Sequence, residues 1–110
     1  MAKRKIDKGV IKSVEKYIAE VGKHYKVENA LLFGSFAKGR QTEDSDIDVA
    51  IITSDIKNKF NEIGKLYLYT KGIDNRIEPH PILTEEFRNR ETPLIDEIIR
   101  TGIPIKILAP

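Results

Sequence analysis

Apolar residues recur along the chain at two spacings, and segments with one spacing alternate with segments of the other. Steps of three and four are typical of amphipathic helices. They predict one helix over about residues 6–25, marked by Val10, Val14, Tyr17, Ile18, Val21 and Tyr25. A second helix before Gly72 is predicted by Ile56, Phe60, Ile63 and Tyr67. A third is bracketed by Thr92 as N-cap, Pro93 as first helical residue and Gly102 as C-cap.

Short apolar runs between these helices predict strands. Residues 30–33 form such a run before Gly34, and residues 46–53 begin with alternation and end as a continuous apolar run. Residues 75–83 predict an edge strand, because Pro79 and Pro81 each lack the N–H that a sheet ladder needs. Residues 103–108 predict a closing strand, and residues 35–38 and 84–87 predict short helical turns. This alternation indicates a layered α/β (α+β) fold in one domain, residues 1–110.

The composition excludes several kinds of chemistry. The 110 residues contain no cysteine, so disulfides, thiolate metal sites and cysteine nucleophiles are absent. The two histidines, His24 and His80, do not favour a histidine-rich metal site or a histidine-dependent triad. No apolar run reaches the roughly 18 residues of a membrane span, and no signal peptide is visible. We therefore expect a cytoplasmic protein that does not associate with membranes.

Charge is distributed unevenly along the chain. Residues 1–40 carry ten Lys or Arg against four acids, whereas residues 41–55 carry five acids and no base. The basic segment is best explained as a solvated helix face. The acidic segment has a second interpretation, in which carboxylates bind cations and nearby bases bind an anionic ligand.

Asp46 and Asp48 are the first candidate site residues. Side chains two apart on a strand project from the same face, so these two carboxylates are expected together. A bare Asp-x-Asp is more often an exposed strand whose charges prevent association. A divalent cation between the carboxylates would remove their repulsion, and oxygen ligands suit Mg²⁺ or Mn²⁺.

Gly34 and Ser35 favour the cation interpretation. A strand that ends in Gly-Ser and continues into a helix presents backbone N–H groups to an anion, although such a dipeptide alone is more often a capped turn. Lys38 and Arg40 follow closely enough to complement a phosphate. Ten residues separate Ser35 from Asp46, so a phosphate cradle is predicted beside a carboxylate pair. This is the outline of a nucleoside triphosphate site.

These residues resemble the signature of the DNA polymerase beta-like nucleotidyltransferases, and most of all the minimal nucleotidyltransferase (MNT) group. The resemblance rests on Gly34-Ser35, ten intervening residues and Asp46-Ile47-Asp48, and it extends over essentially the whole chain. It implies a small palm-type domain with a mixed β-sheet packed by helices. It also implies a third acid on a neighbouring strand. Glu78 occupies that place, with Asp74 as the alternative, and many members have aspartate there.

The resemblance also implies a mechanism. Two Mg²⁺ ions, or Mn²⁺, would be bound by Asp46, Asp48 and Glu78, and a nucleoside monophosphate, AMP from ATP, would be transferred to a hydroxyl group. Gly34, Ser35, Lys38 and Arg40 would bind the nucleotide; Lys38 replaces an arginine found in many relatives. Glu78 would assist deprotonation of the attacking hydroxyl. His80 could share the face of Glu78, but a surface or capping histidine is the better explanation of that residue.

The acceptor is the remaining question. So short a chain leaves no room for a separate acceptor-binding domain, so the acceptor is expected from another chain or from a groove formed in a homo-oligomer. The family resemblance implies a small helical HEPN-type toxin, silenced by transfer of AMP to a tyrosine, with this chain as antitoxin. The alternative is a catalytically silent module that neutralises or scaffolds its partner by contact. Nucleic-acid binding through residues 1–26 is not favoured, since Tyr17 and Tyr25 lie on the apolar helix face.

Overall fold

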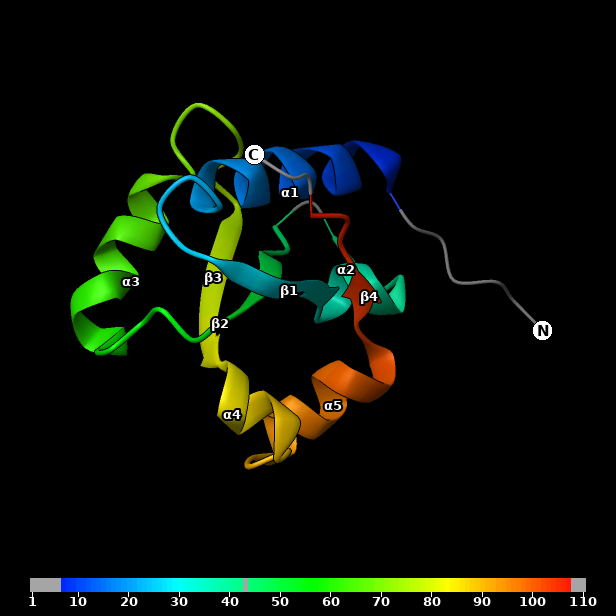
Figure 1. Cartoon of the computed structure of the whole chain (residues 1–110). Coiled ribbons are helices and arrows are strands. Elements are labelled where there is room, and N and C mark those ends of the chain that lie inside the picture. The colour runs from blue at the N-terminus through cyan, green and yellow to red at the C-terminus, as the bar shows by residue number, and fades with distance from the viewer. Residues whose placement is uncertain (1–6, 43, 108–110) are drawn as a thin grey trace.

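A computed structural model describes residues 7–42 and 44–107 of the chain. Helices and strands alternate as the sequence predicts (Figure 1). In chain order they are α1 (Lys8–Val21), β1 (Val27–Phe33), α2 (Ser35–Lys38), β2 (Ile47–Thr53), α3 (Lys59–Leu68), β3 (Ile77–Leu83), α4 (Thr84–Arg88), α5 (Pro93–Thr101) and β4 (Ile103–Pro104). Within the described ranges, no helix is long and apolar enough to cross a membrane.

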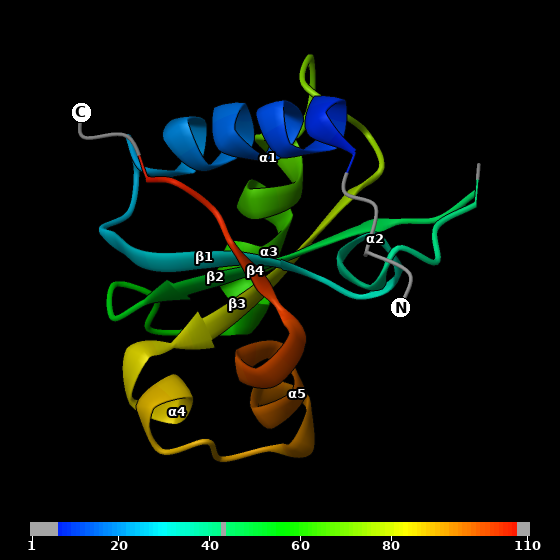
Figure 2. The same ribbon diagram turned by 90° about the vertical axis from the view of Figure 1, so that its right-hand side faces the viewer.

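The four strands form one mixed sheet in the order β3-β2-β1-β4. β1 is antiparallel to both β2 and β4, whereas β2 and β3 are parallel and are joined through α3. Helix α1 covers one face of the sheet, and α4 and α5 lie against the other (Figure 2). The expected α+β fold with a mixed sheet packed by helices is therefore confirmed.

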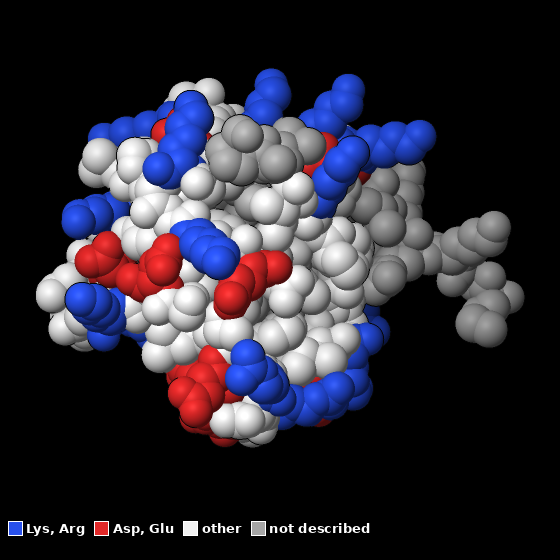
Figure 3. All heavy atoms as spheres, in the orientation of Figure 1, with Lys and Arg blue, Asp and Glu red and all other residues white. Residues whose placement is uncertain are grey.

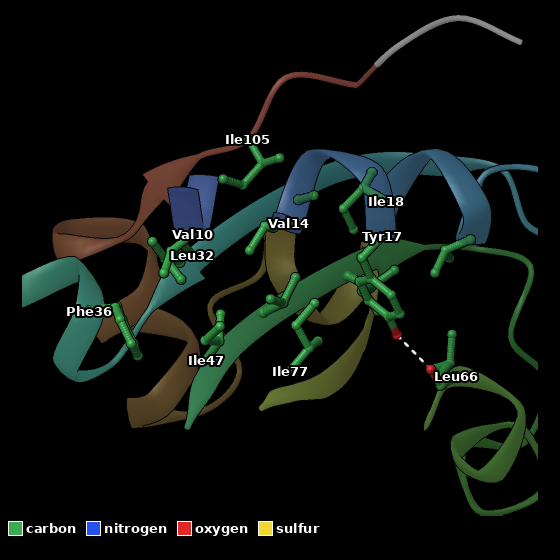
Figure 4. Packing of buried hydrophobic residues seen from close by; sticks show 14 of the residues in the cluster. Val10, Val14, Tyr17, Ile18, Leu32, Phe36, Ile47, Leu66, Ile77 and Ile105 are labelled. Atoms are coloured by element: carbon green, nitrogen blue, oxygen red, sulfur yellow. Dashed lines mark hydrogen bonds between the residues drawn. The ribbon is translucent and has the colours of Figure 1, made fainter. Parts of the chain in front are cut away.

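Each face of the sheet has its own apolar core. Val14, Tyr17 and Ile18 of α1 are at most 1% exposed and pack on the first face with residues of β1, β2 and β3 (Figure 4). The Tyr17 hydroxyl donates to the Leu66 carbonyl oxygen over 2.8 Å, so α1 is also joined to α3. On the second face, Ile95 and the rest of the α5 stripe pack on β1 and β2.

The ends of several elements differ from the prediction. α1 ends at Val21 rather than near residue 25, β1 begins three residues earlier than expected, and β4 contains two residues only. β2 begins at Ile47, so Asp46 precedes the strand instead of opening it. Ile6 and Leu108, where two predicted elements begin or end, lie outside the described residues.

The apolar face predicted for α3 is wrong at two positions. Phe60 is 90% exposed and Tyr67 is 44% exposed, whereas Leu66 is fully buried. Two contacts fix the rotation of the helix. The Asn58 side chain accepts from the Phe60 N–H at 2.9 Å, and the bond from Tyr17 to the Leu66 carbonyl draws that turn of the helix toward α1. The sequence spacing within α3 does not reveal the second contact, because Tyr17 and Leu66 are 49 residues apart along the chain.

β3 forms an edge of the sheet, as its prolines predict. Pro79 and Pro81 have no N–H to offer along that edge. The N–H of Leu83 donates to a Glu86 side-chain oxygen at 2.9 Å, and the N–H of Ile77 donates to the Asp74 carbonyl at 3.3 Å. The backbone N–H groups of the first and last residues of the strand therefore both have acceptors within the chain.

Candidate active site

Asp48 is the second residue of β2, an inner strand with β1 on one side and β3 on the other. Its register partners are Phe33, the last residue of β1, and Glu78 of the parallel strand β3. Side chains of paired residues in adjacent strands lie on the same face. The structure therefore brings Asp48 and Glu78 together, and it places the turn after Phe33 beside them.

Gly34 has a backbone conformation that only glycine adopts readily. Its φ and ψ are 77° and −151°, in a region essentially restricted to glycine. A Cβ at this position would overlap with a carboxylate oxygen of Asp48. The backbone of residue 34 is therefore in direct contact with the Asp48 carboxylate, and it has room for an incoming ligand only because it has no side chain.

The three other residues of the predicted cradle follow directly. Ser35 is half-buried and begins the four-residue helix α2. Lys38 ends that helix, and its ammonium group lies 2.7 Å from a carboxylate oxygen of Glu97 on α5. The backbone N–H of Arg40 donates to the Ser35 carbonyl at 2.9 Å, and its side chain is exposed. Lys38 thus has a carboxylate partner already, a pairing that the sequence did not predict.

Glu78 has two other carboxylates close by. Burial is the largest cause of its raised pKa, and the negative charge of Asp48 raises the pKa further. Asp46 raises it as well, by its charge and by a hydrogen bond to Glu78, whereas His80 lowers it. All three predicted acids therefore lie in one neighbourhood, with Asp46 exposed and the other two half-buried.

Asp74, the alternative third acid, is engaged elsewhere. Its two carboxylate oxygens accept from the Arg76 guanidinium at 3.1 and 2.8 Å, and one also accepts from the Arg76 backbone N–H at 3.0 Å. The hydrogen bonds from Arg76 hold the pKa of Asp74 below its usual range. The structure therefore places Glu78, and not Asp74, beside Asp48.

His80 is not a surface or capping histidine, and this part of the interpretation from sequence is wrong. Its Nε2 atom lies 3.0 Å from an Asp48 carboxylate oxygen, and its side chain is 28% exposed. The ring meets the Phe33 ring edge-on, with 4.8 Å between centroids. The signal was present in the sequence, because His80 follows Glu78 by two residues and so shares its face of β3.

Tyr67 also lies near the acids, although the sequence indicated only a core position for it. Partial burial raises the pKa of its phenol, and the charges of Glu78, Asp46 and Asp48 raise it further. The exposed side of α3 is therefore next to the acidic cluster.

On the face shown in Figure 3, acidic and basic side chains are interspersed, and no single sign of charge covers that face.

A groove of about 380 Å³ begins at Glu78 and His80 and follows β3. Most of its lining is apolar, and the remainder is polar or charged. The lining residues are Lys59, Ile63, Glu78, Pro79, His80, Pro81, Ile82, Glu86, Thr92, Leu94 and Ile95. Because the strands run in the order β1, β2, β3, this groove lies on the opposite side of Asp48 from Gly34.

Comparison with known proteins identifies the family. The family model for "Polymerase beta, Nucleotidyltransferase" matches residues 15–107. The chain belongs to this nucleotidyltransferase family. The matched range includes the turn at Gly34 and the carboxylates of Asp48 and Glu78.

Two relatives of this nucleotidyltransferase come from Methanocaldococcus jannaschii. "Putative protein adenylyltransferase MJ0141" is 31% identical over 99 residues, which cover 87% of this chain and 95% of that protein. "Putative protein adenylyltransferase MJ1379" is 59% identical over 27 residues, or 24% of this chain and 27% of that one. A solved structure titled "putative nucleotidyltransferase", from Sulfolobus solfataricus, superimposes with a TM-score of 0.62 at 20% identity. It covers 94% of this chain and 89% of that chain, and at this identity it shows the fold alone.

Divalent metals are general in nucleotidyltransferases, and the donor set of this chain fits one. Asp48, Glu78 and His80 each offer a ligand atom, and these atoms all lie within 4.8 Å of one another. Carboxylate oxygens at this spacing repel each other unless a proton or a cation lies between them. Burial and then the negative charge of Asp48 raise the pKa of Glu78, and a bound cation would lower it.

Proposed function

We propose that this nucleotidyltransferase transfers AMP from ATP to a hydroxyl group of a partner protein, in a reaction that depends on divalent metal ions. The proposal rests on one observation: the Gly34 backbone contacts the carboxylate of Asp48, whose register partner is Glu78. A phosphate at this turn would lie next to a cation at the carboxylates. The names of the M. jannaschii relatives support a protein as the acceptor.

Asp46, Asp48 and Glu78 are the residues that would hold two Mg²⁺ ions. Such ions, when bound, neutralise the triphosphate and lower the pKa of an attacking hydroxyl. Gly34 and Ser35 would bind phosphate oxygens through backbone N–H groups and the serine hydroxyl. Lys38 and Arg40 would complement the phosphate charge. Lys38 would leave its ion pair with Glu97 to do so, and the loss of such an exposed ion pair costs little free energy.

The transfer itself needs no side-chain nucleophile. The acceptor oxygen forms a bond to the α-phosphorus, the bond from that phosphorus to the bridging oxygen breaks, and pyrophosphate leaves. The acceptor proton passes to Glu78. Glu78 is the register partner of Asp48, so it would lie beside a hydroxyl that is activated at these carboxylates.

The groove along β3 is the proposed acceptor site. It lies across Asp48 from Gly34, so a group in the groove would approach the α-phosphorus from the side opposite the phosphate cradle. In-line displacement requires this geometry, since the entering and leaving oxygens lie on opposite sides of phosphorus. The lining is mostly apolar, and the Glu86 carboxylate in it is paired with Lys59, so the groove favours an uncharged side chain over a polyanion.

We further propose that the partner is a small helical HEPN-type toxin, with this chain as its antitoxin. The family resemblance and the exposed apolar residues Phe60 and Leu68 on α3 support a macromolecular partner. The competing hypothesis is a silent module that inhibits its partner by contact alone. The intact set of Gly34, Asp48 and Glu78 favours the enzyme.

The decisive experiment measures modification and inhibition in the same samples. The chain is incubated with its co-purified partner, ATP and Mg²⁺, and the partner is weighed by mass spectrometry while its activity is assayed. We expect one or more added AMP masses together with loss of partner activity. With Glu78→Gln we expect turnover to fall by about 10²–10⁴, with a much smaller loss of ATP affinity. Full inhibition without any added mass would refute catalysis and leave the contact module.

A further inference from the structure

His80 supplies an imidazole to a site that is otherwise made of carboxylates. Its Nε2 atom, not its carbon edge, faces the acids, at 3.0 Å from Asp48. The edge-on contact with Phe33 supports the ring from the side of β1. The donor atoms of His80, Asp48 and Glu78 all lie within 4.8 Å of one another.

This spacing is close to that of a formed metal site. Two ligands on opposite sides of one ion, each at about 2.0–2.2 Å, are separated by at most about 4.4 Å. The three groups would therefore need to move by only a few tenths of an ångström to contact one ion. They come from adjacent strands in register, Asp48 on β2 and the other two on β3, so the sheet holds their backbones in place.

We propose that His80 is a metal ligand, and that it forms with Asp48 and Glu78 a site that prefers Mn²⁺ or a similar transition-metal ion over Mg²⁺. Mg²⁺ takes oxygen ligands, whereas imidazole suits first-row transition metals. The inference deepens the proposed function, on which it rests for the presence of a metal at these acids. It names the ion class and a ligand that the two-carboxylate pattern does not contain.

The two proposed metal positions then differ in chemistry. Asp46 and Asp48 provide only oxygen, which together with phosphate oxygens suits Mg²⁺. Asp48, Glu78 and His80 provide oxygen and nitrogen, on the side where the groove begins. Asp48 belongs to both positions. The ion on the nucleotide side and the ion on the acceptor side are of different kinds, because only the second has a nitrogen ligand.

The other role open to His80 is to position Asp48 by a hydrogen bond, without contacting a metal. A direct spectroscopic measurement separates the two. In pulsed electron paramagnetic resonance of bound Mn²⁺, a coordinated nitrogen gives a large ¹⁴N hyperfine coupling, whereas a nitrogen outside the coordination sphere gives only a weak one. A positioning histidine leaves the Mn²⁺ spectrum free of coordinated nitrogen.

The experiment uses the full chain with Mn²⁺ and no nucleotide. We expect ¹⁴N modulation in the wild type and its loss in His80→Gln, which keeps a group able to hydrogen-bond Asp48. The matched control is His24→Gln, because His24 stacks on Tyr69 and pairs with Glu20 instead of the acids. Loss of a residue that only supports a metal ligand costs about 10–100-fold in affinity, so we expect His80→Gln, which removes a ligand, to weaken Mn²⁺ binding by at least this much and to change Mg²⁺ binding far less.

Three results would overturn the inference. They are a wild-type Mn²⁺ spectrum without coordinated nitrogen, no Mn²⁺ binding at all in the absence of nucleotide, and equal Mn²⁺ affinity in the wild type and His80→Gln. The wild-type spectrum is decisive even if a variant fails to fold. Absence of AMP transfer would refute the proposed function and leave the metal measurement unaffected, so the two failures are distinguishable.

Discussion

Replacing Gly34 by alanine is the sharpest test of the site geometry. The added methyl group would overlap with an Asp48 carboxylate oxygen. Asp48 belongs to β2, an inner strand whose backbone is held on both sides and cannot move away from the methyl group. The Asp48 side chain would have to leave its rotamer or the turn would have to open. The first movement separates the carboxylate from Glu78 and His80, and the second moves the backbone of the turn away from the carboxylate.

Two costs are expected, and they act on different quantities. A non-glycine residue in this backbone region costs about 1–3 kcal/mol, which lowers the free energy of unfolding. Displacement of a group that ligates or orients a metal typically costs about 10–100-fold in metal affinity. The variant should therefore lose stability and bind Mn²⁺ and ATP-Mg²⁺ at least about tenfold more weakly.

Gly72→Ala is the matched control. Gly72 has a φ of 80°, close to the 77° of Gly34, but a Cβ there would meet nothing within 4 Å. It should lose stability, since a left-handed non-glycine residue costs roughly 1–2 kcal/mol, and it should bind metal and nucleotide as the wild type does. Urea unfolding and isothermal titration calorimetry measure the two quantities on both variants. Wild-type affinity in Gly34→Ala, with its fold intact, would refute the contact between the turn and Asp48.

Four further outcomes are expected. Asp48→Asn should abolish transfer and Mn²⁺ binding, and calorimetric titrations with Mn²⁺ that match the wild type would contradict this loss of binding. The same variant should raise the unfolding free energy of the metal-free protein at neutral pH, because it removes the repulsion between Asp48 and Glu78. Because the pKa of Glu78 is raised, the folded state keeps a proton that the unfolded chain loses above about pH 4.5. The stability of the metal-free protein should therefore fall as the pH rises toward the raised pKa. Glu78→Gln should remove this fall, as measured by urea unfolding. Tyr17→Phe should cost about 0.5–1.5 kcal/mol by urea unfolding, because the Leu66 carbonyl loses its donor; a neutral result would mean that this bond contributes nothing. Leu94→Arg, at a groove residue that is 44% exposed, should lower kcat/KM for the acceptor without changing ATP affinity, and an unchanged kcat/KM would count against the groove.

The sequence predicted the order of elements and the glycine turn because these depend on local patterns. Thr92, for example, caps α5 by accepting from the Ile95 N–H at 3.1 Å, as a Thr-Pro pair at a helix start indicates. The family resemblance implied Glu78 as the third acid, with Asp74 as the alternative, and the structure places Glu78 beside Asp48; its role in catalysis stays a prediction.

Features that depend on contacts between distant segments were not predictable in the same way. The rotation of α3 follows from a bond between Tyr17 and Leu66, which are 49 residues apart. The role of His80 beside Asp48 depends on the parallel register of β2 and β3, which no pattern in either strand specifies. The pairing of Lys38 with Glu97 depends likewise on the packing of α5 against β1.

The outer edge of β3 limits how any partner can be recognised. Backbone groups along a strand alternate in direction, so Ile77, Pro79, Pro81 and Leu83 face the same side. Two of these residues have no N–H, and the N–H groups of the other two are engaged with Asp74 and Glu86. An extended segment of another protein therefore finds carbonyl acceptors but no donors, and it cannot continue the sheet by strand addition. The strand that carries Glu78 can remain open to solvent without polymerising, and selectivity for an acceptor must come from its side chains and not from its main chain.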